Sequence, residues 1–292
     1  MTLLTWLSLI ACSLIIAGAG ISAYGTKRWN RTMIKQTEGL EIAKIGTSGK
    51  PPCPTRFDSR ELEGLPAPVQ RYFRAVLVEG QPIIDAATID MAGRFIMAPS
   101  GEQWRPFMSR QRVVTRRPGF LWNAQIAMFP GLKVRVVDSY IAGQGLLHAA
   151  IFGLFTMAKI SGSGEIARGE FMRFFAEAAW YPTALLPGQG VRWDAVDDHS
   201  ANATMVDGAL ALTLLFRFND AGLIDSFRAE ARGGATVGEK MVMLPWEGRY
   251  ANYQTHGGMS VPMQGEVAWM RPEGRQPYFV GTVTAVAYEF AS

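Results

Sequence analysis

Residues 209–232 read ALALTLLFRFNDAGLIDSFRAEAR, and this stretch predicts the fold of most of the chain. Apolar and polar side chains alternate on both sides of Asn219-Asp220-Ala221-Gly222. Alternation with a period of two is typical of half-buried strands, and a short connection that contains glycine is typical of a β-hairpin. A second hairpin is predicted where Arg271-Pro272-Glu273-Gly274 separates residues 267–269 from residues 277–279.

The same alternation begins near residue 84 and continues almost to the C-terminus. The strands it predicts are 86–98, 103–116, 120–128, 132–141, 190–195, 200–207, 209–218, 223–232, 239–246, 259–270 and 277–290. So many strands joined by short turns favour a mainly antiparallel meander. The predicted fold is therefore α+β and mainly β: a curved antiparallel sheet or half-barrel with a few covering helices.

Three segments depart from this alternation. Apolar residues in 65–79 recur with helical spacing, which predicts an amphipathic helix. Residues 168–181 predict a second helix, which Pro182 ends. Residues 143–160 are nearly all apolar, and we interpret them as a buried helix under the sheet, with a lipid-facing lid as the alternative.

Residues 2–24 carry no charged side chain and predict a transmembrane helix. As a helix they extend roughly 35 Å, which exceeds the hydrocarbon core of a bilayer. A cleaved signal peptide is the first alternative, but no basic residue precedes the apolar run and the run is long. Lipidation at Leu9-Ile10-Ala11-Cys12 is the second, but the chain stays apolar past Cys12.

The basic residues of the N-terminal region are concentrated beside this segment. Lys27, Arg28, Arg31 and Lys35 are the only charged residues among the first 37, and without them the chain has 25 basic and 25 acidic residues. A neutral remainder excludes a basic footprint for nucleic acid. Anionic lipid headgroups are the partner predicted for the four bases. The expected location is the bacterial cytoplasmic membrane, single-pass, and the positive charges favour a folded domain in the cytoplasm.

The expected organisation has three parts. Residues 1–25 form the transmembrane helix, residues 26–60 a juxtamembrane helix and a linker rich in Gly, Pro and Ser, and residues 61–292 a single β-rich domain. No metal site and no cofactor is predicted, because the two cysteines and the three histidines, His148, His199 and His256, lack ligand spacing.

Two clusters combine carboxyl groups with large aromatic side chains, and we predict that they line a ligand cleft. Their members are Glu177, Trp180, Tyr181, Trp246, Glu247, Arg249, Tyr250 and Tyr253. A strand end that packs its aromatic rings across the sheet is the alternative for the second cluster. Glu170, Arg173 and Glu177 share one flank of the predicted helix, and we interpret that flank as solvated.

Several motifs resemble those of a bacterial family. They are LPAPVQRYF at 65–73, GEFMRF at 169–174, AAWYP at 178–182, PWEG at 245–248 and GEVAW at 265–269. The chain resembles, over about residues 60–290, an uncharacterised membrane-anchored family, the domain of unknown function numbered 6544. That resemblance implies no activity.

A weaker resemblance is to the periplasmic lipoprotein carriers. It is carried by Gly258-Met259-Ser260-Val261-Pro262 and the two long alternating strands there. The resemblance implies a curved antiparallel sheet whose concave face holds acyl chains. It also implies a site outside the cytoplasm, opposite to the side that the charges favour.

The function expected from the sequence is a membrane-tethered binding module for a lipid or another hydrophobic molecule. One alternative is an enzyme that uses Glu177 or Glu247 as a general base in an aromatic-lined cleft. The other is a structural or protein-interaction domain.

Overall fold

The computed structural model describes residues 2–45, 54–96, 103–129, 131–237 and 240–292. In this part of the chain one antiparallel sheet has the order β6-β5-β4-β3-β2-β1-β13-β12-β11-β10-β9-β8-β7. Its strands are β1 (Ile84–Ile96), β2 (Trp104–Val114), β3 (Gly119–Phe129), β4 (Leu132–Ile141), β5 (Gln144–Ile151), β6 (Phe155–Gly162), β7 (Arg192–Asp197), β8 (Ser200–Asp207), β9 (Leu210–Phe218), β10 (Ile224–Val237), β11 (Lys240–His256), β12 (Met259–Arg271) and β13 (Gly274–Phe290).

The helices are short except for the first. They are α1 (Leu3–Ile45), η1 (Ser59–Leu62), α2 (Ala67–Val76), α3 (Glu165–Ala176), η2 (Glu177–Trp180), η3 (Pro182–Leu185) and η4 (Pro187–Gln189), where η marks a 3₁₀-helix. The mainly β, antiparallel prediction is confirmed, and most predicted strands match observed strands within a few residues at each end.

Both predicted hairpins form. The side chain of Asn219 accepts hydrogen bonds from the backbone N–H groups of Ala221 and Leu223, each at 3.0 Å. Gly222 has φ +78°, a left-handed conformation in which glycine is the least strained residue. The second hairpin joins β12 to β13, and Arg271 pairs with Gly274 at its turn.

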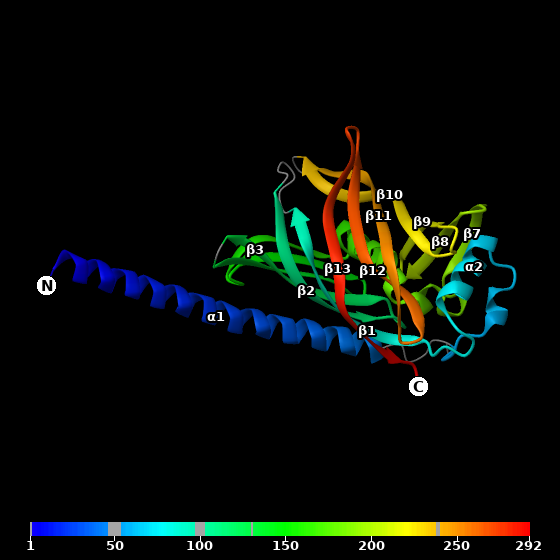
Figure 1. The fold of residues 1–292 in the computed structure, drawn as a ribbon, viewed down its shortest axis with the longest axis horizontal. Coiled ribbons are helices and arrows are strands. Elements are labelled where there is room, and N and C mark those ends of the chain that lie inside the picture. Colours follow the sequence, from blue (N-terminus) through cyan, green and yellow to red (C-terminus); the bar gives the residue numbers. More distant parts are fainter. Residues whose placement is uncertain (1, 46–53, 97–102, 130, 238–239) are drawn as a thin grey trace.

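The sheet bends around α3 (Figure 1). That helix contacts β3, β4, β5 and β6 on one half of the sheet and β9 and β10 on the other. Tyr140 on β4 donates its hydroxyl to Asp207 on β8 at 2.7 Å, which joins the two halves across the inner face. The curved sheet that the alternation predicted is therefore closed over a helix on its concave side.

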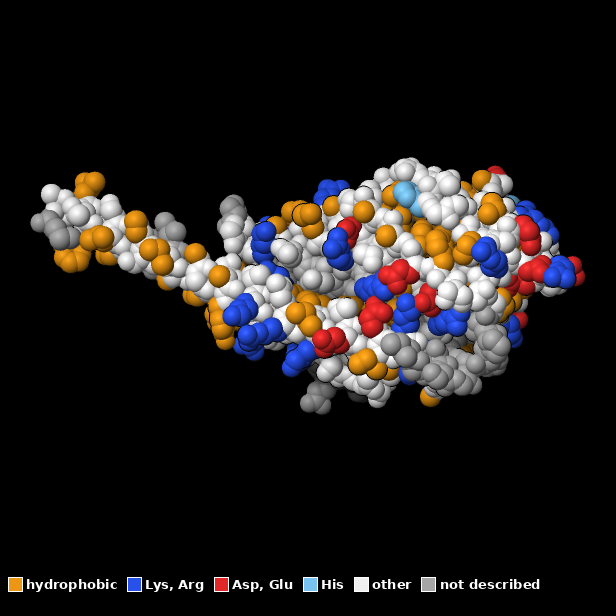
Figure 2. Space-filling view, turned by 90° about the horizontal axis from the view of Figure 1, so that it is seen from below, with side chains coloured by type: hydrophobic (Ala, Val, Ile, Leu, Met, Phe, Trp, Pro, Cys, Tyr) orange, Lys and Arg blue, Asp and Glu red, His pale blue; other side chains and the backbone are white. Residues whose placement is uncertain are grey.

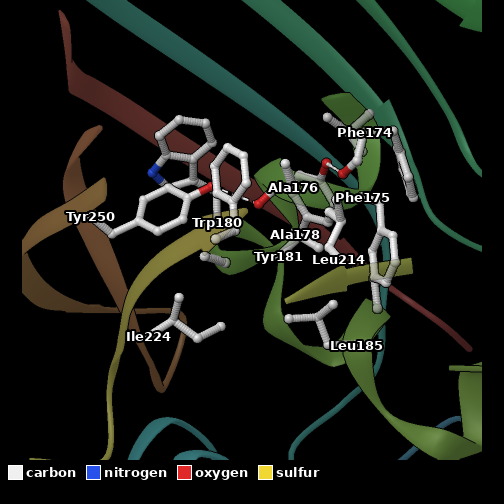
Figure 3. Close-up of a cluster of buried hydrophobic side chains, with 14 of the residues drawn as sticks. Phe174, Phe175, Ala176, Ala178, Trp180, Tyr181, Leu185, Leu214, Ile224 and Tyr250 are labelled. Atoms are coloured by element: carbon white, nitrogen blue, oxygen red, sulfur yellow. Dashed lines mark hydrogen bonds between the residues drawn. The ribbon is translucent and has the colours of Figure 1, made fainter. Parts of the chain in front are cut away.

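Part of the inner face is filled by the protein's own side chains (Figure 3). Phe174, Phe175 and Tyr181 from α3 and the segment after it are fully enclosed, as is Leu185. Burial of one such side chain stabilises a fold by roughly 1.5–3 kcal/mol, which makes this region the main core.

The second half of α1 covers the outer face of the sheet. Trp29 and Leu40 are buried there against Leu121 and Val137. The indole N–H of Trp29 donates to the side-chain oxygen of Asn123 at 3.1 Å. Residues 26–45 are therefore the continuation of one long helix, whereas the sequence predicted a separate juxtamembrane helix.

The first half of α1 projects away from the body (Figure 1). Large apolar side chains such as Leu3, Leu4 and Ile16 are exposed on it, at 78, 77 and 71%. Among the residues whose side chains the structure describes, which omit Ala11, Leu14 and Ile15, no helix is apolar over a length that would cross a membrane. The predicted transmembrane helix is thus not supported by the described residues.

The helix predicted at 143–160 is wrong. That segment forms β5 and β6, joined by a turn in which Phe152 and Gly153 have φ +53° and +73°. The reason is that β5 lies between two helical layers: Leu146 packs with the α1 side, whereas Ala149 faces the inner core. A strand covered on both faces loses its alternation, so its apolar run cannot be distinguished from a buried helix by period.

Two boundaries also differ from expectation. The strand predicted at 239–246 continues as β11 to His256, through the second aromatic cluster. Of the linker predicted at 46–60, residues 46–53 lie outside the described residues. Phe57 is buried and Arg56 pairs with Pro82, so this later part packs against the body.

Candidate functional site

α3 and the first residue of η2 place three charged residues against the inner face of the sheet. Only 4% of Glu170 is exposed, and the side chains of Arg173 and Glu177 are 14 and 15% exposed. The interpretation of this flank as solvated is therefore wrong. The sheet bends over it, and the spacing of charges along a helix does not show which side a later strand will cover.

Arg173 is the centre of the contacts on this flank. Its guanidinium donates to Asp138 Oδ2 and to Glu177 Oε1, both at 2.8 Å. It also lies over the ring of Trp122, 4.7 Å from the centroid. Charge-assisted hydrogen bonds and a cation–π contact together fix the orientation of this side chain.

The sheet supplies the partners of Arg173 from one row across three strands. Gln111, Trp122 and Asp138 are direct cross-strand neighbours on β2, β3 and β4. The amide of Gln111 donates to Glu177 Oε2 at 2.6 Å, and its oxygen accepts from Arg173 at 3.3 Å. The row thus binds both charged groups at the end of α3.

Arg232 reaches the same region from β10, on the other half of the sheet. Its guanidinium stacks over Trp246 at 4.2 Å and lies 5.8 Å from the Trp269 ring. It donates to the backbone oxygen of Gly169 at 3.2 Å, next to Glu170. We call Asp138, Glu170, Arg173, Glu177 and Arg232 the buried charge cluster.

Some polar atoms in and around the buried charge cluster lack a hydrogen-bond partner among the described residues. They are Asp138 Oδ1, Glu170 Oε2, Arg232 Nε, Trp122 Nε1 and Ser109 Oγ. A buried polar atom without a partner is costly, and such atoms in native proteins are usually satisfied by water or by a bound molecule. Their concentration in one region is the first sign of a binding site.

The electrostatics of the cluster favour a neutral acid at Glu170. Burial, and then the neighbouring charge of Asp138, raise the pKa of Glu170 to about 8, against the opposing effects of Arg232 and Arg173. Burial also raises the pKa of Asp138. A protonated Glu170 at neutral pH leaves the cluster with fewer buried negative charges for the two guanidinium groups to face.

Four aromatic side chains stand beside the cluster on the inner face, and we call them the aromatic rim. They are Phe95 on β1, Trp269 on β12, and Tyr278 and Phe279 on β13. Trp269 stacks on Tyr278 at 5.7 Å, and Phe95 meets Tyr278 edge to face at 5.8 Å. Each is only partly buried.

The rim and the cluster are in direct contact. The hydroxyl of Tyr278 accepts from the indole N–H of Trp246 at 2.9 Å and from Arg232 at 3.5 Å. Half-exposed apolar surface therefore borders buried charge on the inner face. A site with aromatic walls and a few convergent polar groups is typical of small-molecule binding.

The structure separates the eight residues that the sequence singled out. Glu177 belongs to the buried charge cluster, and Trp246 connects it to the rim. Four others lie in the packed core, where their ring N–H and hydroxyl groups donate to backbone oxygens: Trp180 to Pro262, Tyr181 to Phe174, Tyr250 to Ala176 and Tyr253 to Ile224.

Glu247 and Arg249 lie on the opposite face of the sheet from Trp246 and Tyr250, because side chains alternate along β11. Glu247 pairs with Arg275 at 3.0 Å and with Arg249 at 3.5 Å. Glu247 and Glu177 therefore do not share a cleft.

Sequence reasoning did not identify Asp138, Arg232 or the aromatic rim as site residues. A signal was present for Asp138: it occupies the apolar phase of its strand, with Val134, Val136 and Tyr140. A charged residue in the buried phase of a strand requires a partner inside the fold. For Arg232 the phase is obscured, because the register of β10 shifts between Ala229 and Arg232.

In the described part of the chain no three His, Cys, Asp or Glu side chains are placed to hold a metal ion. The carboxyl groups of Asp138 and Glu177 are instead hydrogen-bonded by guanidinium and amide donors.

Comparison with protein families gives one assignment. The model of a family of unknown function, DUF6920, matches residues 63–288. The expectation of a family of unknown function is confirmed, whereas the number 6544 is wrong. Comparison with curated protein sequences finds no match.

Several solved structures are similar in part. A LolA superfamily protein from Nitrosomonas europaea aligns with a TM-score of 0.39 and 12% identity, over 77% of this chain and 93% of its own. A β-barrel-like protein of unknown function from Brucella abortus aligns with a TM-score of 0.28 and 8% identity, over 71% of this chain and 99% of its own. A porin-like protein from Bacteroides uniformis aligns with a TM-score of 0.23 and 7% identity, over 71% of this chain and 96% of its own. All three scores are below 0.5, so these likenesses carry no argument about function.

Proposed function

The chain belongs to the family of unknown function DUF6920, and from its own geometry we propose that it is a membrane-anchored module that binds a hydrophobic molecule bearing a polar group. The observation that supports this function is the contact between the half-exposed aromatic rim and the buried charge cluster. The rim is the place for the apolar part of the guest, and the cluster is the place for its polar group.

The rim differs from the rest of the inner face. Elsewhere on that face rings such as Phe174 and Phe175 have no exposed surface, so no guest can reach them. Phe95, Trp269, Tyr278 and Phe279 keep surface that a guest would cover. Burial of about 200 Å² of apolar area would contribute roughly 5 kcal/mol at 25 cal/mol per Å².

The cluster supports a polar group on the guest. Asp138 Oδ1 and Arg232 Nε are an acceptor and a donor without partners among the described residues. A neutral Glu170 has both an O–H donor and a carbonyl acceptor. A hydroxyl or amide group of the guest matches such a mixed set, because it also donates and accepts.

The anchor in this proposal is the first half of α1. Residues 2–24 have no charge, and the four bases that follow, Lys27, Arg28, Arg31 and Lys35, are exposed. Figure 2 shows hydrophobic side chains along the projecting helix and Lys and Arg side chains where it meets the body. This arrangement supports insertion into the bacterial cytoplasmic membrane, with the basic residues at anionic headgroups.

The test is solvent extraction of the full-length protein, purified in one detergent, followed by mass spectrometry of the molecules that co-purify. Lipids around α1 are expected in every preparation. A guest held by the rim is expected in the wild-type protein and depleted at least tenfold in the double variant Trp269→Ala/Phe279→Ala.

The matched control is Phe129→Ala, which removes an exposed ring, 61% accessible, outside the rim. This control is expected to retain the guest. Identical extracts from the wild-type protein, the rim variant and the control would refute guest binding at the rim.

A second candidate is acid–base catalysis in the same cluster. A protonated Glu170 beside the carboxylates of Asp138 and Glu177 provides the acid and base that such chemistry requires. Incubation with extracted bacterial lipids, followed by mass spectrometry, should then show a converted product. Conversion that persists in Glu170→Gln and Glu177→Gln would exclude this role.

A further inference from the structure

We propose that the end of the body from which α1 emerges rests on the surface of an anionic lipid bilayer. The inference builds on the proposed anchoring of α1 and adds a second contact, made by the folded body. This membrane-facing end consists of the β3–β4 and β5–β6 turns, with Phe129, Lys133, Phe155, Met157 and Lys159.

Both turns are fixed beside the point where α1 leaves the body. Gly25 lies so close to the β5–β6 turn that an added Cβ would be 2.2 Å from the Phe152 oxygen. Arg135 on β4 donates to Thr26 Oγ1 at 2.9 Å. Phe152 N–H donates to the oxygen of Lys133, which ties the two turns together. Figure 1 shows the end of β3 on the same side as the projecting half of α1.

The turns present apolar side chains that the fold leaves uncovered. Phe129 is 61% exposed, Phe155 59% and Met157 51%. Phe155 and Met157 belong to β6, the edge strand, in which every residue but the last is exposed. Apolar side chains that lie level with the point where a helix enters a bilayer lower the free energy by inserting among the headgroups.

The charge of this end matches an anionic surface. Between residues 103 and 164 the sequence has one acidic residue, Asp138, and the buried charge cluster encloses it. Lys133 and Lys159 are exposed, and Arg105 lies over the Phe129 ring at 5.1 Å. Each Lys or Arg near an anionic bilayer adds to the electrostatic attraction between the protein and the headgroups.

The bases of α1 continue this surface. An open groove of about 740 Å³ on the helix is lined by Thr26, Lys27, Asn30 and Arg31, among others. The amide of Asn30 and the cationic groups of Lys27 and Arg31 are suitable donors for a lipid phosphate. A second copy of the chain is a less favourable partner for this end, because its basic residues would face the same basic residues and repel them.

The test measures the depth of single labels in proteoliposomes. In a full-length background with Cys12→Ser and Cys53→Ser, Phe129→Cys and Phe155→Cys are labelled with bimane, and quenching by nitroxide-labelled lipid is measured. Val206→Cys on β8 is the control: Val206 is 56% exposed, and its neighbour Asp207 contacts Tyr140, at the end of β4 opposite to the β3–β4 turn. Vesicles of phosphatidylcholine are used with and without phosphatidylglycerol, and flotation records whether the protein is in the vesicles.

The expected result is flotation, with quenching at positions 129 and 155 at least threefold above position 206 and stronger with phosphatidylglycerol. Flotation without this difference overturns the inference while the anchor stands. Equal quenching with and without phosphatidylglycerol overturns the anionic preference. Protein that does not float refutes the anchor, and the inference falls with it.

Discussion

Glu170 is enclosed between Asp138 and the guanidinium groups of Arg173 and Arg232, and this enclosure has a consequence for stability. The carboxyl group ionises near pH 4.5 in an unfolded chain but near pH 8 in the fold. Between these values the folded state keeps a proton that the unfolded state has released. The free energy of unfolding therefore falls as pH rises from about 4.5 to about 8.

Glu170→Gln is expected to flatten this slope, because glutamine stays neutral at every pH. The variant should be more stable than the wild-type protein at pH 8 by a few kcal/mol, at roughly 1.4 kcal/mol per unit of pKa. A slope of the same sign should remain, since the pKa of Asp138 is also raised. Urea unfolding between pH 5 and pH 9 measures it, with the exposed Glu273→Gln as the control. An unchanged slope in Glu170→Gln would contradict the assignment.

Arg173→Met is expected to lower the free energy of unfolding by about 3–5 kcal/mol, because it leaves Asp138 and Glu177 buried without their cation. The matched control is Arg249→Met. Arg249 is 59% exposed and 3.5 Å from Glu247, so its loss should cost less than about 1 kcal/mol. Urea unfolding of both variants at pH 7 tests the difference, and equal losses would show that the cluster is not an interdependent network.

At the scale of elements, the attachment of α1 depends on one close approach. An added Cβ at Gly25 meets the Phe152 oxygen at 2.2 Å, whereas at Gly39, on the same helix, nothing lies within 4 Å. Gly25→Leu should therefore separate α1 from the β5–β6 turn, and Gly39→Leu should not. Hydrogen exchange of residues 25–45 measures the separation. If exchange in Gly25→Leu stays at wild-type levels, the β5–β6 turn has moved to accommodate the leucine and α1 has stayed attached.

The elements that sequence reasoning predicted well are those with one buried face. Strands such as β9 and β12 face the core on one side and solvent on the other, so their alternation is visible. β5 has α3 on one side and α1 on the other, and its alternation is lost. The helical layer that covers a strand is a tertiary feature, and no local period records it.

The site was predictable only in part for the same reason. Glu177 and Trp246 were identified because each lies in a short stretch of sequence that combines a carboxyl group with large aromatic side chains. Asp138 stands alone among apolar neighbours, and its partners come from α3, which follows it by two strands. Arg232 reaches Gly169, next to Glu170, because the sheet bends around α3, and it reaches Trp269 across β11.

At the scale of the whole molecule, the basic residues beside the uncharged segment set the expected orientation. A green fluorescent protein fused to the C-terminus in a bacterial host should fluoresce, and an alkaline phosphatase fusion should be inactive, because both then lie in the cytoplasm. Replacing Lys27, Arg28, Arg31 and Lys35 by Gln should give a mixed orientation. Replacing the distant Arg192 and Arg249 should change nothing, and an active phosphatase fusion on the wild-type protein would reverse the assignment.

The continuity of α1 limits how the body can move. The helix runs unbroken from Leu3 to Ile45, and near its end Lys44 is bound to Asp85 at the start of β1. If a bilayer holds the first half of α1, the sheet cannot rotate independently of the helix. Each tilt or rotation of α1 then turns the whole folded body. A protein held in this way would not carry cargo across a compartment. It would meet its guest at a constant height above the bilayer.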